Sequence, residues 1–464
     1  MSGSRNGAIA RAEQYFDDGG FLDDLQRRVA IPTTSQEQGS MPALQQYVSG
    51  EMTESLQKMG YDCSVFPNPR PEYGPFLIAR RVEDASKPTV LTYGHGDVIR
   101  GQEDQWRAGL SPWKIVVEGD KMYGRGTADN KGQHTINIAA LACVLEERGS
   151  LGFNSTILIE TGEETGSPGL ADFCKANKDA LKADALIGSD GPRLDHRRPC
   201  IFGGTRGTLN FNLKLSYREG GHHSGNWGGL LANPGIVMAH ALATITDERG
   251  QIKVPEWRPQ SLTNSVRAAL ADVSIDAGEG APRIHEDWGE KSLTPIERVF
   301  GWNSFEVLAF KTGNPDRPVN AIPPSAIAYC QLRFVVGTDP HDIIPALRRH
   351  LEKHGFGDIE VVQAREVIMN ATRLDPDNPW AKFAAKSLET TFGAKPHILP
   401  NLGGSLPNEV FTDILGMPTV WVPHSYAACS QHAPDEHLLA PVAREGLRLM
   451  TGIFWDLGQQ GRPA

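Results

Sequence analysis

Acidic and histidine side chains stand where predicted strands end, and their types are those that bind metal ions. Apolar runs, followed by short polar segments, lead into His95, Asp129, Glu163, Glu164, Asp190 and His432. In an open α/β sheet, ligands gather beyond the carboxyl ends of the strands. We therefore expect these side chains to meet in one crevice, although they span most of the chain.

The spacing of these residues suits a pair of metal ions. Two divalent ions about 3.5–4 Å apart need a bridging carboxylate with flanking nitrogen and oxygen ligands. The sequence offers such ligands in His95, Asp129, Glu164, Asp190 and His432. Histidine and carboxylate ligands without cysteine suit zinc, and also manganese or cobalt. Glu163 is free to accept a proton from water, and Asp97, two residues after His95, can accept the second imidazole N–H.

The elements that must position these residues alternate between helix and strand up to residue 202. Apolar periodicity predicts helices over 8–16, 21–29, 41–59 and 132–147, and strands over 64–66, 75–80 and 89–93. Strands separated by helices of this length are typical of βαβ units. The fold class is therefore α/β, with a mainly parallel sheet flanked by helices in the catalytic domain.

A second pattern begins after Gly203. Residues 207–215 alternate between apolar and polar with a period of two, as in a half-buried antiparallel strand. This pattern predicts a smaller α+β lid or dimerisation domain, 203–367, inserted into a catalytic domain of 1–202 and 368–464. We expect strand 207–215 to offer an exposed edge through which the chain forms a homodimer.

Composition excludes several other classes of protein. The chain has 464 residues, a net charge of −10 and 39% hydrophobic residues, so no nucleic-acid face is indicated. No run reaches the length of a membrane-spanning helix, and the polar N-terminus lacks the apolar core of a signal peptide. We expect a cytoplasmic protein without nucleic-acid or membrane partners. The six cysteines show no C-x-x-C spacing, so no thiolate zinc site is predicted.

The combined motifs resemble the M20 family of metallopeptidases, in its carnosinase-like and cytosolic dipeptidase branch. The resemblance covers nearly the whole chain and is carried by 94–98 (GHGDV), 124–132 (GRGTADNKG), 163–167 (EETGS), 189–190 (SD) and 432–436 (HAPDE). Supporting motifs are 204–207 (GTRG) with Thr205, 223–229 (HSGNWGG) and 403–407 (GGSLP) with Ser405. The resemblance implies that Thr205 and Ser405 help to bind substrate.

The resemblance also implies a role for each metal ligand. His95 and Asp190 would hold one metal and Glu164 and His432 the other, with Asp129 as the bridge. Glu163 would be the general base. The peptide bond after the bridging aspartate is often cis in the family.

Substrate contacts are implied for three residues of the inserted domain. His223 resembles the histidine that reaches the partner subunit's site and stabilises the oxyanion. Arg333 resembles the arginine that holds a substrate carboxylate, a role that suits its guanidinium fork. Asn320 stands where close dipeptidase relatives tend to carry Thr and other members Asn.

The leading hypothesis is a dinuclear metallohydrolase that cleaves the amide of a dipeptide or a small N-acyl amino acid. An N-acyl or N-carbamoyl amino-acid amidohydrolase with a specialised substrate, and a non-catalytic binding protein of this fold, are the alternatives. A third class is a hydrolase that uses Ser224 or Cys429 as nucleophile. Activity that resists chelators would favour this third class.

Overall fold

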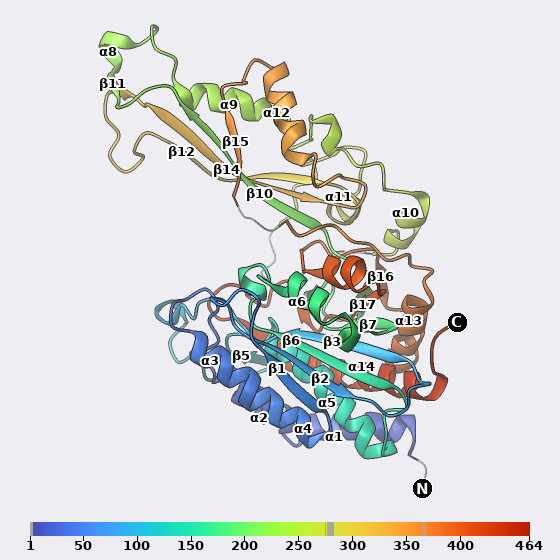
Figure 1. Cartoon of the computed structure of the whole chain (residues 1–464). Helices are drawn as coiled ribbons and strands as arrows, with labels where there is room; N and C mark the ends of the chain where they lie inside the picture. The colour runs from blue at the N-terminus through green and yellow to red at the C-terminus, as the bar shows by residue number, and fades with distance from the viewer. Residues whose placement is uncertain (1–2, 274, 276–282, 365–367) are drawn as a thin grey trace.

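Two sheets form the centres of two lobes in the computed structural model, which describes residues 3–273, 275, 283–364 and 368–464 (Figure 1). The large lobe contains both ends of the described chain, and the small lobe is built from its middle. This arrangement confirms the predicted α/β class with an added α+β part. The boundaries at 202/203 and 367/368 stay a prediction.

The large lobe is built on an eight-stranded sheet whose centre is parallel. The strand order is β1-β2-β6-β3-β7-β17-β9-β16, and β6, β3, β7 and β17 run parallel to one another. The bounds are β1 Asp62–Phe66, β2 Phe76–Arg81, β3 Thr89–His95, β6 Asn154–Glu160, β7 Ala185–Gly188, β9 Cys200–Phe202, β16 His397–Leu399 and β17 Thr419–Trp421. The central strands β6, β7 and β17 are buried along their whole length, as expected for a sheet covered on both faces.

Helices cover both faces of this sheet. One face packs against α1 Arg5–Asp17, α2 Gly20–Val29, α5 Lys131–Arg148, α13 Pro379–Phe392 and α14 Ala440–Gln460. The predicted helix 41–59 is α3 Met41–Gln46 and α4 Thr53–Lys58, joined by a π-helical turn Tyr47–Met52. The other face packs against α6 Leu170–Ala176, α7 Lys178–Leu181 and a π-helical turn Val410–Ile414.

Short strands at the rim of the large lobe have no counterpart in the sequence prediction. They are β4 Val116–Glu118, β5 Lys121–Tyr123, β8 Pro192–Arg193, β18 Ser425–Tyr426 and β19 His437–Leu439. β19 pairs with β5, and the glycine-rich segment 124–132 follows β5 directly. This pairing places the chain after His432 beside the segment that carries Asp129.

The small lobe has a four-stranded antiparallel sheet with two helices packed on it. The strand order is β12-β14-β10-β15. The bounds are β10 Gly207–Ser216, β12 Ser304–Thr312, β14 Ser325–Phe334, β15 Glu360–Gln363, α9 Pro234–Ile245 and α12 Ile343–Lys353. The prediction that strand 207–215 is an exposed edge is wrong, because β10 pairs with β14 on one side and β15 on the other. The edge strands are β12 and β15, and the middle of β12 is exposed.

At its tip the small lobe carries a separate hairpin. β11 His222–His223 pairs with β13 Ala321–Ile322, and the short helix α8 Ser224–Trp227 follows β11. Figure 1 shows β11 and α8 at the end of the small lobe that points away from the large lobe.

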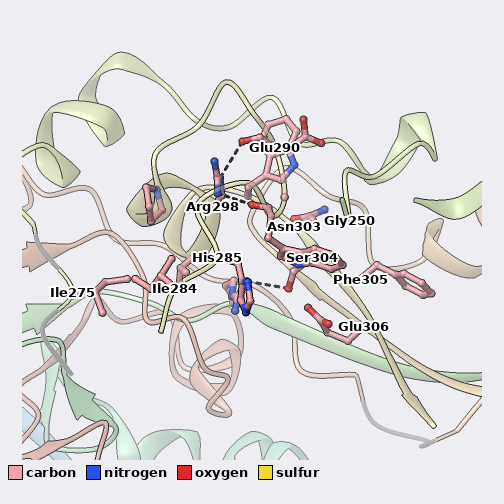
Figure 2. Close-up of a pocket in the computed structure, with 16 residues that line it drawn as sticks. Gly250, Ile275, Ile284, His285, Glu290, Arg298, Asn303, Ser304, Phe305 and Glu306 are labelled. Atoms are coloured by element: carbon pink, nitrogen blue, oxygen red, sulfur yellow. Dashed lines mark hydrogen bonds between the residues drawn. The ribbon is translucent and has the colours of Figure 1, made fainter. Parts of the chain in front are cut away.

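Two helices lie where the lobes meet, α10 Asn264–Leu270 and α11 Pro295–Phe300. Their buried residues belong to the same apolar cluster as Leu402 and Phe411 of the large lobe. Residues of α11 line part of a cavity of about 730 Å³ (Figure 2). In the described part of the chain, no helix combines the length and apolarity needed to cross a membrane.

Candidate metal centre

The ends of the parallel strands bring the predicted ligands together. His95 is the last residue of β3, Glu163 and Glu164 follow β6, and Asp190 follows β7. Two donor groups form, one of His95, Asp129 and Asp190 and the other of Asp129, Glu164 and His432, with the donor atoms of each group within 4.8 Å of one another. Asp129 belongs to both groups, so its two oxygens lie between them.

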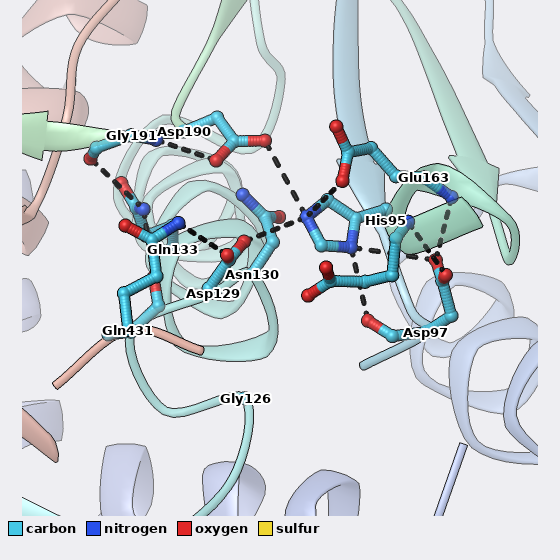
Figure 3. Close-up of polar contacts among 12 residues, drawn as sticks. His95, Asp97, Gly126, Asp129, Asn130, Gln133, Glu163, Asp190, Gly191 and Gln431 are labelled. Atoms are coloured by element: carbon cyan, nitrogen blue, oxygen red, sulfur yellow. Dashed lines mark hydrogen bonds and ion pairs between the residues drawn. The ribbon is translucent and has the colours of Figure 1, made fainter. Parts of the chain in front are cut away.

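His95 is the buried centre of the first group (Figure 3). Its Nε2 lies 2.9 Å from Asp129 Oδ1 and 3.7 Å from Asp190 Oδ2. On the other side of the ring, Nδ1 lies 3.1 Å from the backbone carbonyl of Asp97 and 3.5 Å from its carboxylate. Nε2 therefore faces the ligand cluster, while Asp97 fixes the orientation of the ring.

His432 is the exposed member of the second group. Its Nε2 lies 3.0 Å from Asp129 Oδ2 and 3.0 Å from Glu164 Oε2. Its side chain is 54% exposed, whereas that of Glu164 is 3% exposed. The second group therefore opens toward solvent and the first is closed.

Asp97 also positions the acidic pair Glu163–Glu164. Its carboxylate accepts the backbone N–H of Glu163 at 3.2 Å and that of Glu164 at 3.1 Å, and the Ser35 hydroxyl at 2.6 Å. The pair lies in a single 3₁₀ turn, so its two side chains leave the backbone in different directions. Glu163 Oε2 comes within 3.9 Å of His95 Nε2.

Carboxylates outnumber cationic groups in this cluster, and the pKa values reflect it. Hydrogen bonds to Asp129 and Glu164 raise the pKa of His432 to about 11. Burial, together with the charge of Asp129, raises the pKa of Glu164 to about 7 and that of Asp190 to about 6. Burial alone would lower the pKa of His95, but its hydrogen bonds to carboxylates raise that pKa well above its usual value. The cluster attracts positive charge.

The loop that carries Asp129 is held by Glu436, from the last of the motifs. Glu436 Oε1 accepts the backbone N–H groups of Gly126, Ala128 and Asp129 at 3.0, 3.0 and 3.1 Å. Its other oxygen lies 2.8 Å from Nη1 of Arg125, and both side chains are only 1% exposed. The Asp129–Asn130 peptide bond is cis, as the resemblance implies.

A buried chain of hydrogen bonds lies beneath the ligands. The Tyr47 hydroxyl lies 2.6 Å from His134 Nε2, and His134 Nδ1 lies 3.0 Å from Asn130 Oδ1. Asn130 Nδ2 donates to the Ser189 carbonyl at 2.9 Å. The chain thus connects the residue after Asp129 to the residue before Asp190. Sequence reasoning missed this network, because an ordinary buried Tyr and His carry no signal in one sequence.

Gln431 is a further residue that sequence reasoning missed. Its Nε2 donates to Asp129 Oδ2 at 2.5 Å, the same oxygen that faces His432. It also lines the cavity of about 390 Å³ that contains Asp129, Glu163, Asp190 and His432, which we call the metal cavity. Its position next to His432 in sequence was the available signal.

The donor set fits divalent metal ions. Two imidazoles and three carboxylates lie around Asp129, a combination that suits zinc, manganese or cobalt. Asp190 Oδ2 is buried and has no hydrogen-bond partner in the part of the chain that the structure describes. A buried carboxylate oxygen without a partner is costly, and a cation between it and His95 would remove that cost.

Two of the predicted substrate residues lie together at the junction of the lobes. Arg333, near the end of β14, donates from Nη1 to the Ser405 hydroxyl at 3.1 Å. Ser405 lines the metal cavity. Thr205 is fully buried instead, with its hydroxyl donating to the carbonyl of Leu406 at 3.5 Å. Thr205 therefore contacts the backbone next to Ser405 and does not line the metal cavity.

The other two lie at the tip of the small lobe. His223 is exposed on β11, and its neighbour Ser224 donates through both its backbone N–H and its hydroxyl to the Asn320 carbonyl, at 2.9 and 3.2 Å. The structure therefore groups Asn320 with His223 and not with Arg333. In Figure 1 this tip lies away from the large lobe of the same chain.

The Ser/Cys nucleophile hypothesis finds little support in the geometry. Cys429 is fully buried, and burial raises the pKa of its thiol to about 12, so it stays protonated at neutral pH. Ser224 lies at the lobe tip with its hydroxyl donating to a backbone carbonyl.

Comparison with known proteins identifies the relatives of this chain. Residues 91–456 match the model of peptidase family M20/M25/M40. The chain is 25% identical over 500 residues to a Beta-Ala-His dipeptidase of Rattus norvegicus, which covers 99% of this chain and 97% of that protein. It is 30% identical over 474 residues to the Cys-Gly metallodipeptidase dug1 of Schizosaccharomyces pombe, covering 94% and 95% of the two chains.

A solved structure shows the same fold. The di-peptidase Dug1p from Saccharomyces cerevisiae superposes with a TM-score of 0.81 at 21% identity, and the match covers the whole of both chains. Both lobes are therefore shared with that protein.

Proposed function

The chain belongs to peptidase family M20/M25/M40, and from that premise we propose that it hydrolyses the amide bond of a dipeptide or small N-acyl amino acid with two divalent metal ions. The observation that carries this proposal is the pair of donor groups that share Asp129. The dipeptidase names of the two sequence relatives support a dipeptide as the first substrate to test.

We assign each ion to one donor group. His95 and Asp190 would hold the first ion and Glu164 and His432 the second, and Asp129 would be shared by both. Bound there, the ions would supply Lewis-acid activation of water and of the amide carbonyl. Zinc is our first choice, with manganese or cobalt as alternatives.

Glu163 is our general base. Its carboxylate lines the metal cavity and makes no hydrogen bond within the described part of the chain. It is therefore free to take a proton from the attacking water and to deliver that proton to the leaving amine. Asp97 positions Glu163 by holding its backbone N–H.

Arg333 and Ser405 are our candidates for the carboxylate end of the substrate. The guanidinium can pair with a carboxylate through two N–H groups, and the Ser405 hydroxyl beside it lines the metal cavity. A substrate carboxylate bound here would leave the adjacent amide bond near Glu163.

We further propose that the protein is a homodimer in which His223 and Asn320 act in the partner's site. They lie together at a lobe tip that points away from their own metal centre. The edge strand β12 exposes Val307, Leu308 and Phe310, at 43%, 58% and 44%. An exposed apolar edge strand is a natural site of pairing with a second copy. A cytoplasmic location stays a prediction from the sequence.

The test is a hydrolysis screen of dipeptides and N-acyl amino acids with zinc, manganese and cobalt in turn, on wild type and Glu163→Gln. Turnover by the variant should fall by at least the roughly 10²–10⁴-fold that is typical of general acid–base catalysis. Metal analysis should still find two ions per chain. Glu72→Gln, at an exposed position of the same lobe, is the matched control. Near-normal turnover by Glu163→Gln would refute its role.

Mixing two inactive variants tests the partner site. In a heterodimer of His223→Ala and Glu163→Gln chains, one site lacks both groups and the other is intact. Activity should reappear when subunits exchange. Activity that stays at the level of the separate variants, or a protein that is monomeric by light scattering, contradicts the shared site.

A further inference from the structure

A second and larger cavity opens beside the metal cavity. It has a volume of about 730 Å³, compared with about 390 Å³ for the metal cavity, and we call it the lobe cavity. Val299 and Ile275 line both cavities. Val299 lies on α11, which packs against Gly403: a Cβ on that glycine would come within 2.9 Å of Val299 Cγ1. The side chains of α11 are therefore the partition between the two spaces.

The wall of the lobe cavity is largely apolar and aromatic. Trp288, Trp302 and Phe305 contribute rings, and Ile284 and Val299 contribute aliphatic groups; Figure 2 shows Ile275, Ile284 and Phe305 around the space. The indole N–H of Trp302 is buried and donates to no acceptor in the described residues. Apolar pockets of roughly 300–1,000 Å³ with a few polar groups are typical binding sites for small molecules.

The carboxylate-binding end of the proposed site lies next to this cavity. Arg333 on β14 is directly opposite Ser304 on β12, and Ser304 lines the lobe cavity. Arg206, also in the wall, donates to Ser304 Oγ at 3.4 Å and to the Gly403 carbonyl at 2.7 Å. A substrate whose carboxylate reaches Arg333 thus has its adjacent side chain at the mouth of the lobe cavity.

We propose that the lobe cavity binds the side chain of the carboxyl-terminal amino acid of the substrate and selects large apolar, best aromatic, side chains. This inference rests on the proposed function, because it takes the carboxylate to be held at Arg333. A glycine or alanine side chain would leave an apolar cavity of this size unfilled, whereas a phenyl ring would be buried among rings.

The first test compares alanyl-alanine with alanyl-phenylalanine. One methylene in an apolar pocket is worth about 10–200-fold in discrimination, so wild type should prefer alanyl-phenylalanine by at least about tenfold in kcat/KM. Val299→Trp, at the partition, and Ile284→Trp, at the 46% exposed rim, should each reduce this ratio by about tenfold. Val117→Trp, at a 49% exposed position on β4 of the large lobe, is the control and should keep the ratio.

A ratio near one in wild type overturns the inference, as does an unchanged ratio in the folded variants. If Val299→Trp fails to fold by circular dichroism, Ile284→Trp decides. Calorimetric titration with L-phenylalanine and with L-alanine separates this inference from the proposed function, because it needs no turnover. If neither a dipeptide nor an N-acyl amino acid is hydrolysed, the proposed function fails. Tighter binding of L-phenylalanine that Ile284→Trp abolishes still supports the cavity, and equal binding of the two amino acids overturns it.

Discussion

Replacing Glu436 with glutamine should loosen the loop that carries Asp129. One oxygen of the Glu436 carboxylate accepts three backbone N–H groups of that loop, and the other pairs with Arg125 at 2.8 Å. In Glu436→Gln the amide oxygen can still accept from the loop. Its NH₂ group must then face the Arg125 guanidinium, donor against donor.

The magnitude follows from burial. Arg125 and Glu436 are each 1% exposed, so the variant leaves a guanidinium charge buried without its partner. Removing one member of a buried ion pair costs about 3–5 kcal/mol. Arg125 keeps its hydrogen bonds to the Ala433 carbonyl and to Gln102. We therefore expect a cost at the lower end of this range of free energies. A group that orients a ligand typically contributes about 10–100-fold in metal affinity, and we expect a loss in that range.

The assay measures the two effects separately. Urea unfolding of the chelated protein should show a loss of about 3 kcal/mol in the free energy of unfolding. Titration of the same protein with zinc against a competing chelator should show the loss in metal affinity. Asp456→Asn is the control, because Asp456 pairs with Arg5 at 2.8 Å far from the loop; it should lose stability with metal affinity intact. A Glu436→Gln protein that loses stability but binds zinc as tightly as wild type would show that Glu436 does not position Asp129.

Three further outcomes are expected. Tyr47→Phe removes the hydroxyl that faces His134 Nε2, so urea unfolding should show a loss of about 1–3 kcal/mol, and no loss would contradict the network. Burial raises the pKa of Glu409 from 4.5 to about 8, so between these pH values the folded chain holds a proton that the unfolded chain releases. The free energy of unfolding should therefore fall as pH rises from about 4.5 to about 8, by no more than about 5 kcal/mol. Glu409→Gln should flatten that decline between pH 5.5 and pH 8 in urea unfolding, and an equal slope in both proteins would refute it. Chelation should lower the thermal midpoint, since a ligand at a thousandfold excess over its Kd contributes about 4 kcal/mol, and an unchanged midpoint would argue against metal binding by the folded chain.

The cluster of candidate metal ligands could be predicted because its formation does not depend on the order of the strands in the sheet. His95, Glu164 and Asp190 each follow an apolar run, and any parallel arrangement of those runs brings their ends to one edge. The same reasoning could not find Gln431 or His134. Their contacts with Asp129 and Asn130 depend on how distant loops pack, and a glutamine or buried histidine alone has no distinctive spacing.

Strand neighbours were the weak point of the sequence reasoning. The alternation in residues 207–215 correctly predicts which side chains of β10 face the core. The alternation carries no information on how many strands flank β10, so it cannot distinguish an interior strand from an edge strand. Likewise, Asn320 and Arg333 are close in sequence but lie at opposite ends of the small lobe. Asn320 comes just before β14, and Arg333 lies near the end of that long strand.

The interleaving of β17 has a consequence for how the chain folds. This strand comes from residues 419–421, yet it lies between β7 and β9, which end by residue 202. During synthesis, the first 202 residues therefore have two apolar strands whose central neighbour does not yet exist. Such open edges invite pairing with other chains, and contacts so distant in sequence are slow to form. The large lobe should complete its sheet only after translation of the small lobe has finished, so a stalled or truncated chain is the form most prone to aggregate.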